Sequence, residues 1–344
     1  MIERLGVLGA GNWIVDNVKV IDVWPSQDAL AIILAETHGT GGSPFNVLTD
    51  LARLGAPFPL FGAGVIGADS AGDWIIEQCR ASGINTDQLH RSSSAPTSYT
   101  DVMTVQSSGR RTFFHQHGAN SLFDVSSVDL RRAPARILHL GYLLLLGRLD
   151  VPSPTHGCRA AELLDAATSA GYEVSIDAVS EESDRYQQIV PPCLPHVDYT
   201  FLNEFEAARV AQIPIRSGET LDHGALAASA RAILNFGVRR WVFIHFPEGV
   251  FAASAGGQAY FHPSLQLPST FVAGATGAGD AIAAGILLGL HERMPMLETL
   301  RLGVCAAGSC LQHPSATAGV VSIRECLALG EKHGFRGEVV ERSV

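Results

Sequence analysis

The sequence is poor in basic residues, in aromatic residues and in long apolar runs. Lysine and arginine number 24 against 34 aspartate and glutamate residues, so the formal net charge is −10. A broad surface that neutralises nucleic-acid phosphates needs the opposite balance, which excludes nucleic acid as a partner. A small anionic ligand is still compatible with this charge, because backbone N–H groups can make a single pocket locally positive.

No apolar run has the length of a membrane-spanning helix. The most apolar stretch, residues 137–147, is far shorter than the roughly 20 residues that such a helix needs, and it predicts a buried strand instead. Residues 1–11 lack the basic stretch and long apolar segment of a secretory signal. We therefore expect a soluble cytoplasmic protein without a membrane partner.

Cysteine is scarce as well, and its positions form no recognisable site. The six residues are Cys79, Cys158, Cys193, Cys305, Cys310 and Cys326. None forms a C-x-x-C pair, so the spacing predicts neither a zinc site nor a disulfide framework. We expect free, buried thiols, as in a protein of a reducing compartment.

What the sequence does have is 47% hydrophobic residues and only 17% charged ones, which excludes intrinsic disorder. Helical patterns closed by glycine occur at 43–54 and 70–82. From residue 137 onward, apolar strands alternate with helices, and a polar segment separates the strands expected at 173–177 and 199–202. This alternation predicts a three-layer α/β/α sandwich with a mostly parallel sheet.

Strand patterns in the first third of the chain have a different style. Short, partly alternating apolar pieces occur at residues 18–23, 29–35, 98–106 and 111–117. They predict a small β-sheet lid, formed by about residues 12–40 and 96–118, on a single domain that spans residues 1–344. Aromatic side chains on an exposed lid also predict that two lids pair in a homodimer.

The most informative segment is 274–289, where Gly277-Ala278-Gly279-Asp280 precedes small apolar residues at helical spacing. Glycines before a helix let the backbone approach a ligand, and the free N–H groups of the first turn favour an anion. An aspartate there can be a base that deprotonates a hydroxyl while the amides hold a transferring phosphoryl group. It can equally be an N-cap. The residues alone leave both interpretations open.

A second polar segment, Asn203-Glu204-Phe205-Glu206, directly follows the strand expected at 199–202. Ligands gather at the carboxyl ends of parallel strands, and an amide with carboxylates suits a hydrated Mg²⁺. The same residues also fit a helix cap, with Asn203 as N-cap and Glu206 at N3. These two interpretations stay open as well.

A third segment, residues 39–46 (GTGGSPFN), opens the helix expected from residue 43. Its glycines allow close contact between the backbone and a ligand, and Asn46 can hydrogen-bond hydroxyl groups. Asp16, just beyond the first strand, can accept hydroxyl protons from a polyol. The segment therefore predicts a binding site for a hydroxylated ligand.

Together these segments resemble the PfkB (ribokinase-like) family of carbohydrate and nucleoside kinases. The matching residues, in chain order, are Asp16, Gly41-Gly42 with Asn46, Val65–Asp69 with Gly72, Asn203–Glu206 and Gly277–Asp280. A single G-x-G-D match is weak, whereas several spaced motifs in the right order are specific. The resemblance covers nearly the whole chain and implies a ribokinase-like kinase that uses ATP and Mg²⁺, with a monovalent cation as a further expected cofactor.

The resemblance also implies a role for each matching residue. Asp280 would be the general base that deprotonates a sugar or polyol hydroxyl, with the amides of Gly277, Ala278 and Gly279 as its anion hole. The acceptor would be bound by Asp16, Gly41, Gly42 and Asn46. The nucleotide side would be formed by Asn203, Glu206 and Gly249, with Glu206 holding Mg²⁺ through water.

The chain departs from the family pattern at several places. Gly274-Ala275 replaces an Asp-Thr pair. Residues 244–249 (IHFPEG) correspond to the T-L-G-x-x-G turn, and phenylalanine stands in place of its first glycine. The D-x-N-x-R motif, starting at Asp177, lacks its Asn and Arg. Gly141-Tyr142 stand where an acidic sugar contact is frequent. These differences leave the phosphoryl-transfer residues intact and bear on cation, nucleotide and sugar specificity.

Three alternatives accompany this hypothesis: a nucleoside kinase similar to adenosine kinase, a non-catalytic sugar- or nucleotide-binding relative, and a dehydrogenase. Residues 9–14 begin like a dinucleotide fingerprint, but Ile14 replaces its last glycine and strands follow, which disfavours the dehydrogenase. His115 and His117 are expected on the lid surface. His139 and His245 lie in apolar strands and are expected in the core or in the wall of a site.

Overall fold

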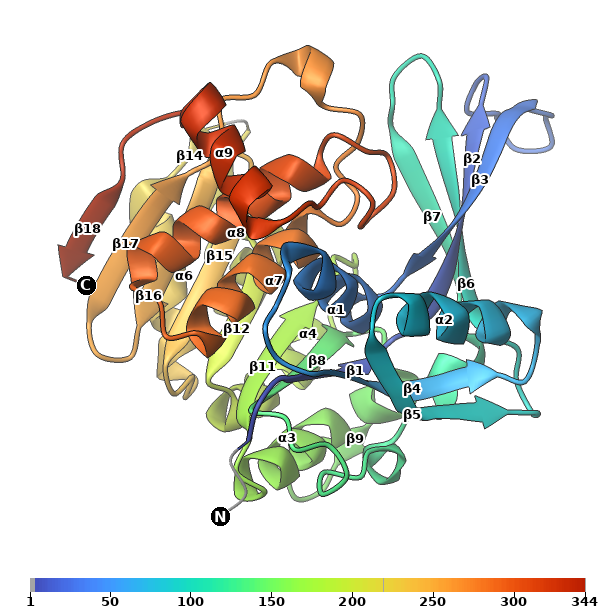
Figure 1. The fold of residues 1–344 in the computed structure, drawn as a ribbon, viewed down its shortest axis with the longest axis horizontal. Helices are drawn as coiled ribbons and strands as arrows, with labels where there is room; N and C mark the ends of the chain where they lie inside the picture. The colour runs from blue at the N-terminus through green and yellow to red at the C-terminus, as the bar shows by residue number, and fades with distance from the viewer. Residues whose placement is uncertain (1–3, 219, 344) are drawn as a thin grey trace.

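A ten-stranded sheet forms the centre of the chain, in a computed structural model that describes residues 4–218 and 220–343 (Figure 1). Its strand order is β18-β17-β16-β15-β12-β11-β8-β1-β4-β5. The seven parallel strands are β1 (Val7–Gly11), β4 (Leu60–Gly67), β5 (Ile84–Ser92), β8 (Ile137–Leu143), β11 (Glu173–Ala178), β12 (Tyr199–Asn203) and β15 (Trp241–Phe246). An antiparallel edge consists of β16 (Gly249–Ser254), β17 (Gln258–Pro263) and β18 (Val340–Ser343).

Helices cover both faces of this sheet. They are α1 (Ser43–Leu54), α2 (Ser70–Ala81), α3 (Arg159–Ser169), α4 (Tyr186–Cys193), α5 (Glu204–Ala211), α6 (His223–Asn235), α7 (Ala278–His291), α8 (Met296–Cys310) and α9 (Ile323–His333). One buried apolar cluster joins the sheet to α3, α4, α5 and α6, and a second joins it to α1, α2, α7 and α8. Two cores on one sheet make the predicted three-layer sandwich. No helix in the described residues is long and apolar enough to cross a membrane.

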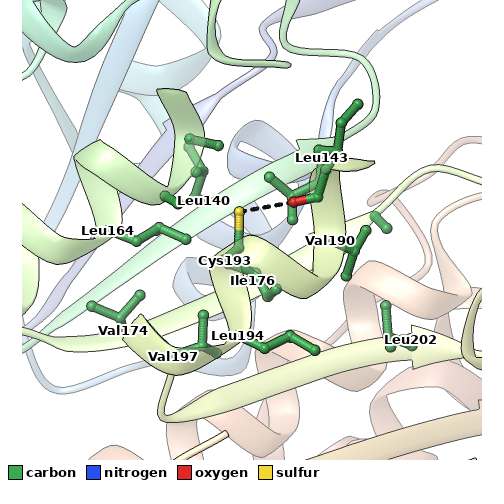
Figure 2. Packing of buried hydrophobic residues seen from close by; sticks show 14 of the residues in the cluster. Leu140, Leu143, Leu164, Val174, Ile176, Val190, Cys193, Leu194, Val197 and Leu202 are labelled. Atoms are coloured by element: carbon green, nitrogen blue, oxygen red, sulfur yellow. Dashed lines mark hydrogen bonds between the residues drawn. The ribbon is translucent and has the colours of Figure 1, made fainter. Parts of the chain in front are cut away.

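Figure 2 shows part of the first cluster, where Leu140 and Ile176 of the sheet pack with Leu164 of α3 and Val190 of α4. The Cys193 thiol lies among these side chains and donates a hydrogen bond to the carbonyl of Ile189 at 3.2 Å. All six cysteines are free and buried, as the sequence predicts. They act here as small apolar side chains that fill the core.

A second sheet of four strands stands apart from the body (Figure 1). Its strands are β2 (Ile14–Ile21), β3 (Ile33–Gly41), β6 (Ser98–Val105) and β7 (Arg111–Gln116), in the order β3-β2-β6-β7. The bounds predicted for the first two strands are wrong: β2 begins four residues earlier than predicted, and β3 runs six residues further. Polar residues such as Asp16 and Asn17 lie within β2, so apolar alternation alone does not reveal its start.

Helix α4 occupies the polar segment between β11 and β12, where the sequence analysis expects no helix. Pro191 and Pro192 lie inside it, and proline disfavours a helix because it lacks an N–H group. Tyr186, Ile189 and Val190 are nevertheless buried against the sheet. Tertiary packing therefore overrides local propensity in this segment.

Candidate active site

Two cavities adjoin at the first turn of α7. One has a volume of about 440 Å³ and the other about 580 Å³. Both are lined by Asn203, His245 and Gly279, so these residues separate one cavity from the other. The smaller is here named the carboxylate cavity and the larger the apolar cavity.

The carboxylate cavity lies between the small sheet and the body. The small sheet contributes Asp16, Thr100, Phe113 and His115, and the body contributes Gly42, Asn46, Tyr142, Asp177, Glu206, Gly277 and Asp280 among others. Four of these side chains are carboxylic acids, and none of the described lining residues is lysine or arginine. Burial raises the pKa of Asp16 to about 6, although a hydrogen bond with Thr100 lowers this pKa in part.

Asp280 is the third residue of α7 and is 94% removed from solvent, with 6% of its surface exposed. The N-cap of α7 is Gly277, so the interpretation of Asp280 as an N-cap is wrong. The carboxylate instead accepts a hydrogen bond from Asn46 Nδ2 at 2.9 Å. Burial, followed by the charge of Asp177, raises the pKa of Asp280 to about 7. A carboxylate with this pKa is suited to general base catalysis near neutral pH.

Tyr142 lines the carboxylate cavity, although the sequence marks it only as a departure from the family pattern. Its hydroxyl donates to both carboxylate oxygens of Asp280, at 3.0 and 2.9 Å. Burial, followed by the charge of Asp280, raises the pKa of Tyr142 well above its ordinary value. The phenol therefore stays protonated and holds the carboxylate in place.

Replacing Tyr142 with phenylalanine removes a donor that favours the ionised form of Asp280, so we expect the pKa of that carboxyl to rise. Activity that depends on the deprotonated base should then require higher pH than in the wild type. The acid limb of a kcat/KM profile against pH measures this shift. An unshifted limb in Tyr142→Phe would show that the tyrosine does not tune the base.

Asp177 lies at the end of β11 and takes part in a buried polar network. Ser43 donates to its Oδ2 atom, and Ser43 Oγ also lies 3.0 Å from Nε2 of His139. The other ring nitrogen of His139 lies 2.9 Å from Ser175 Oγ. The second oxygen of Asp177, Oδ1, is buried and has no hydrogen-bond partner in the described chain. The network thus fixes the carboxylate and leaves one of its oxygens without a partner in the described chain.

Asn203 and Glu206 form a reciprocal cap at the start of α5. The Glu206 amide donates to Asn203 Oδ1 at 2.9 Å, and the Asn203 amide donates to Glu206 Oε2 at 2.9 Å. Ser180 Oγ and Asn203 Nδ2 both donate to Glu206 Oε1 at 2.8 Å. The capping interpretation of this segment is confirmed. Burial raises the pKa of Glu206 to about 8.

The residues around this cap fit a hydrated Mg²⁺ ion better than a directly coordinated one. No group of three or more metal-ligating side chains occurs within residues 4–218 and 220–343. Glu206 already accepts protein donors at both oxygens. An ion here would keep its water ligands and reach Asn203 and Glu206 through them, as Mg²⁺ commonly does.

The apolar cavity extends from the first turn of α7 along the antiparallel edge of the sheet. Its lining includes Phe246, Gly249, Leu265, Val272 and Ala278. An apolar slot suits a planar heterocycle, and the N–H groups at the start of a helix suit phosphates. The departure at Phe246 contributes to the wall of this slot.

The loop before α7 departs from the family pattern and contacts the small sheet. A Cβ atom on Gly274 would lie 2.9 Å from Nη2 of Arg111, which is on β7, and 3.1 Å from Cα of Pro314. The small sheet therefore reaches the loop that carries the first turn of α7. Gly274 itself offers no carboxylate to a monovalent cation. The role of such a cation remains a prediction.

The structure brings together most of the residues that the sequence analysis selects. Those that line a cavity are Asp16, Gly42, Asn46, Asn203, Glu206, Gly249, Gly277, Ala278, Gly279 and Asp280. Gly41 is not among the lining residues and ends β3 against Asp16, where a Cβ atom would lie 2.2 Å from Asp16 Oδ2. Its lack of a side chain makes room for that carboxylate.

Comparisons with known proteins show the family and the fold of this chain. The sequence model of the pfkB family of carbohydrate kinases matches residues 13–323. The chain is 28% identical to the fructokinase of Salmonella typhimurium over 280 residues, 78% of this chain and 84% of the relative. It is 24% identical to the ribokinase of Arabidopsis thaliana over 303 residues, 86% and 74% of the two chains. The structure of that plant's ribokinase with ribose and ATP superposes with a TM-score of 0.77 at 21% identity. The superposition covers 95% of this chain and 98% of the ribokinase chain.

Proposed function

The chain belongs to the pfkB family of carbohydrate kinases, and we propose that it transfers the γ-phosphoryl group of ATP to a hydroxyl of an uncharged sugar or polyol. The observation that carries this proposal is a set of unpaired polar atoms. Asn46, Asp177 and His115 line the carboxylate cavity, and Asn46 Oδ1, Asp177 Oδ1 and His115 Nε2 are buried without a hydrogen-bond partner in the described chain. Each unpaired buried group costs about 1–3 kcal/mol, which several hydroxyl groups on one ligand would offset.

The charge of the cavity supports an uncharged acceptor. Asp16, Asp177, Glu206 and Asp280 line it, without a lysine or arginine among the described lining residues. A carboxylate or phosphate on the acceptor would lie among these acidic side chains with no lysine or arginine to pair with, which disfavours binding. Sugar acids and sugar phosphates are therefore poor acceptors in this proposal.

The proposed reaction takes place where the two cavities adjoin. Asp280 accepts the proton of the acceptor hydroxyl, and the amides of Gly277, Ala278 and Gly279 hold the charge on the transferring group. The acceptor is oriented by Asp16, Gly42 and Asn46. The nucleotide lies in the apolar cavity beside Gly249, and Asn203 and Glu206 contact hydrated Mg²⁺. The ion, when bound, supplies positive charge to the phosphates of ATP.

An acceptor panel tests this proposal. ATP consumption is measured with uncharged sugars such as fructose and ribose, with adenosine, and with a sugar acid. We expect turnover with one or more uncharged sugars and none with the acid. Turnover with adenosine alone would indicate a nucleoside kinase, and nucleotide binding without any turnover would indicate a non-catalytic relative.

Asn46→Ala should raise the KM for the sugar and leave the KM for ATP unchanged.

The small sheet is proposed to pair two chains into a dimer. Exposed apolar side chains occur on β3 and in the segment just before it, among them Leu30, Ile32 and Leu34, of which Leu34 is 47% exposed. Leu34→Asp should convert a dimer into a monomer, because a charge in an apolar interface is costly. Val151→Asp, at a site of 46% exposure on the body, is the matched control. Light scattering after size exclusion measures the mass, and a wild type of monomer mass would contradict the proposal.

A further inference from the structure

His245 lies where the two cavities adjoin. It is near the end of β15, opposite Asn203 of β12 in the parallel register, and it lines both cavities. A Cβ atom added to Gly279 would lie 3.0 Å from Cε1 and 3.3 Å from Nε2 of this ring. The imidazole therefore packs against the first turn of α7, beside the amides assigned to the anion hole.

The ring of His245 has no hydrogen-bond partner in the part of the chain that the structure describes. His139, the buried histidine of β8, differs, because both of its ring nitrogens lie within 3.0 Å of serine oxygens. In the turn motif that this chain resembles, leucine stands at the position of His245, so packing alone does not require an imidazole. The ring is partly exposed and lines both cavities, so its N–H group is available to a partner outside the chain.

We propose that His245 donates a hydrogen bond to the phosphoryl group as it passes from nucleotide to acceptor. This inference rests on the proposed function. A group that moves between the cavities must pass the residues common to both, namely Asn203, His245 and Gly279. The acceptor oxygen forms a bond to phosphorus while the bond to the ADP oxygen breaks, and the acceptor proton goes to Asp280.

The protonation state of the imidazole fits this role. Burial lowers the pKa of His245 to about 4, so the ring is neutral and carries one N–H donor at neutral pH. A neutral ring keeps its proton throughout the step and supplies only a hydrogen bond. Hydrogen bonds to charged groups are among the strong ones in proteins.

The test compares binding of ADP with and without aluminium fluoride, which mimics the transferring phosphoryl group, in the presence of magnesium. The variants are His245→Leu, which keeps an apolar side chain, and His245→Gln, which keeps an N–H donor. His262→Leu is the matched control, since His262 also lies in the large sheet but is buried and lines neither cavity. Calorimetry measures the affinities, and steady-state kinetics with the acceptor found in the panel measures turnover.

We expect His245→Leu to bind ADP as tightly as the wild type does. Addition of aluminium fluoride should raise the ADP affinity of the wild type but not that of His245→Leu. Its kcat should fall about 10- to 100-fold with both KM values unchanged, and His245→Gln should recover part of the loss. If aluminium fluoride raised the ADP affinity of His245→Leu as much as that of the wild type, and turnover were also unchanged, this inference would be overturned. The proposed function would still stand. Failure of the wild type to bind ADP would overturn both.

Discussion

Asp280→Asn is expected to lower kcat by about 10²- to 10⁴-fold while acceptor binding stays nearly unchanged. The amide keeps the shape of the side chain and one acceptor oxygen for the Tyr142 hydroxyl, but it cannot take a proton. Wild-type kcat/KM should rise as pH increases through about 7, because the base must lose its proton and the pKa of Asp280 is about 7. Steady-state kinetics against pH, with calorimetry of acceptor binding, measures both effects.

The matched control for this variant is Asp50→Asn. Asp50 is a fully buried carboxylic acid on α1 that lines neither cavity, and burial raises its pKa well above the ordinary value. Asp50 does not reach the proposed acceptor or nucleotide, so an amide of the same shape there should leave turnover unchanged. Wild-type turnover in Asp280→Asn would exclude Asp280 as the base.

Gly277→Ala is expected to lower kcat by about 10²- to 10³-fold, the effect of disrupting an oxyanion donor. Gly277 has a φ of 79°, and a Cβ atom there would lie 2.1 Å from the carbonyl oxygen of Ala316. The atoms that this Cβ would meet belong to the backbone of Ala316 and cannot rotate away, so the first turn of α7 must shift to relieve the clash. A displacement of about 1 Å at a reacting centre can cost about 10²-fold in rate.

Gly55→Ala separates the effect of this clash from that of backbone strain. Gly55 also has a positive φ, 84°, but nothing lies within 4 Å of an added Cβ atom. It should lose about 1–2 kcal/mol of stability, as a left-handed alanine does, and keep its activity. Thermal unfolding and kinetics of both variants measure the difference. Equal activity of Gly277→Ala and Gly55→Ala would contradict the assigned anion hole.

Local patterns predict those parts of the fold that depend on local chemistry. Helix α1 begins and ends at the predicted residues, because glycines stand at both of its ends. The segment Asn203–Glu206 caps α5 as its spacing predicts. Helix α4 and the true start of β2 escape prediction, because packing and a polar cavity wall decide them.

In the candidate site too, residues of short motifs could be predicted from the sequence, whereas contacts between distant residues could not. Its motif residues can be found from spacing, since each motif is a short segment with its own backbone chemistry. Tyr142 and Asp280 are 138 residues apart, and Ser43 and Asp177 are 134 apart. Nothing in a single sequence indicates that these pairs are in contact. The unpaired atoms of His115 and Asp177 likewise appear only once the two sheets are placed together.

Phosphorus NMR of the protein with ATP, magnesium and the acceptor found in the panel tests the central claim most directly. The wild type should convert the γ-phosphate signal into that of a phosphomonoester together with ADP. Asp280→Asn should produce neither signal over the same time, and Asp50→Asn should produce both. Phosphomonoester formation by Asp280→Asn at the wild-type rate, or inorganic phosphate as the only product of the wild type, would contradict the account.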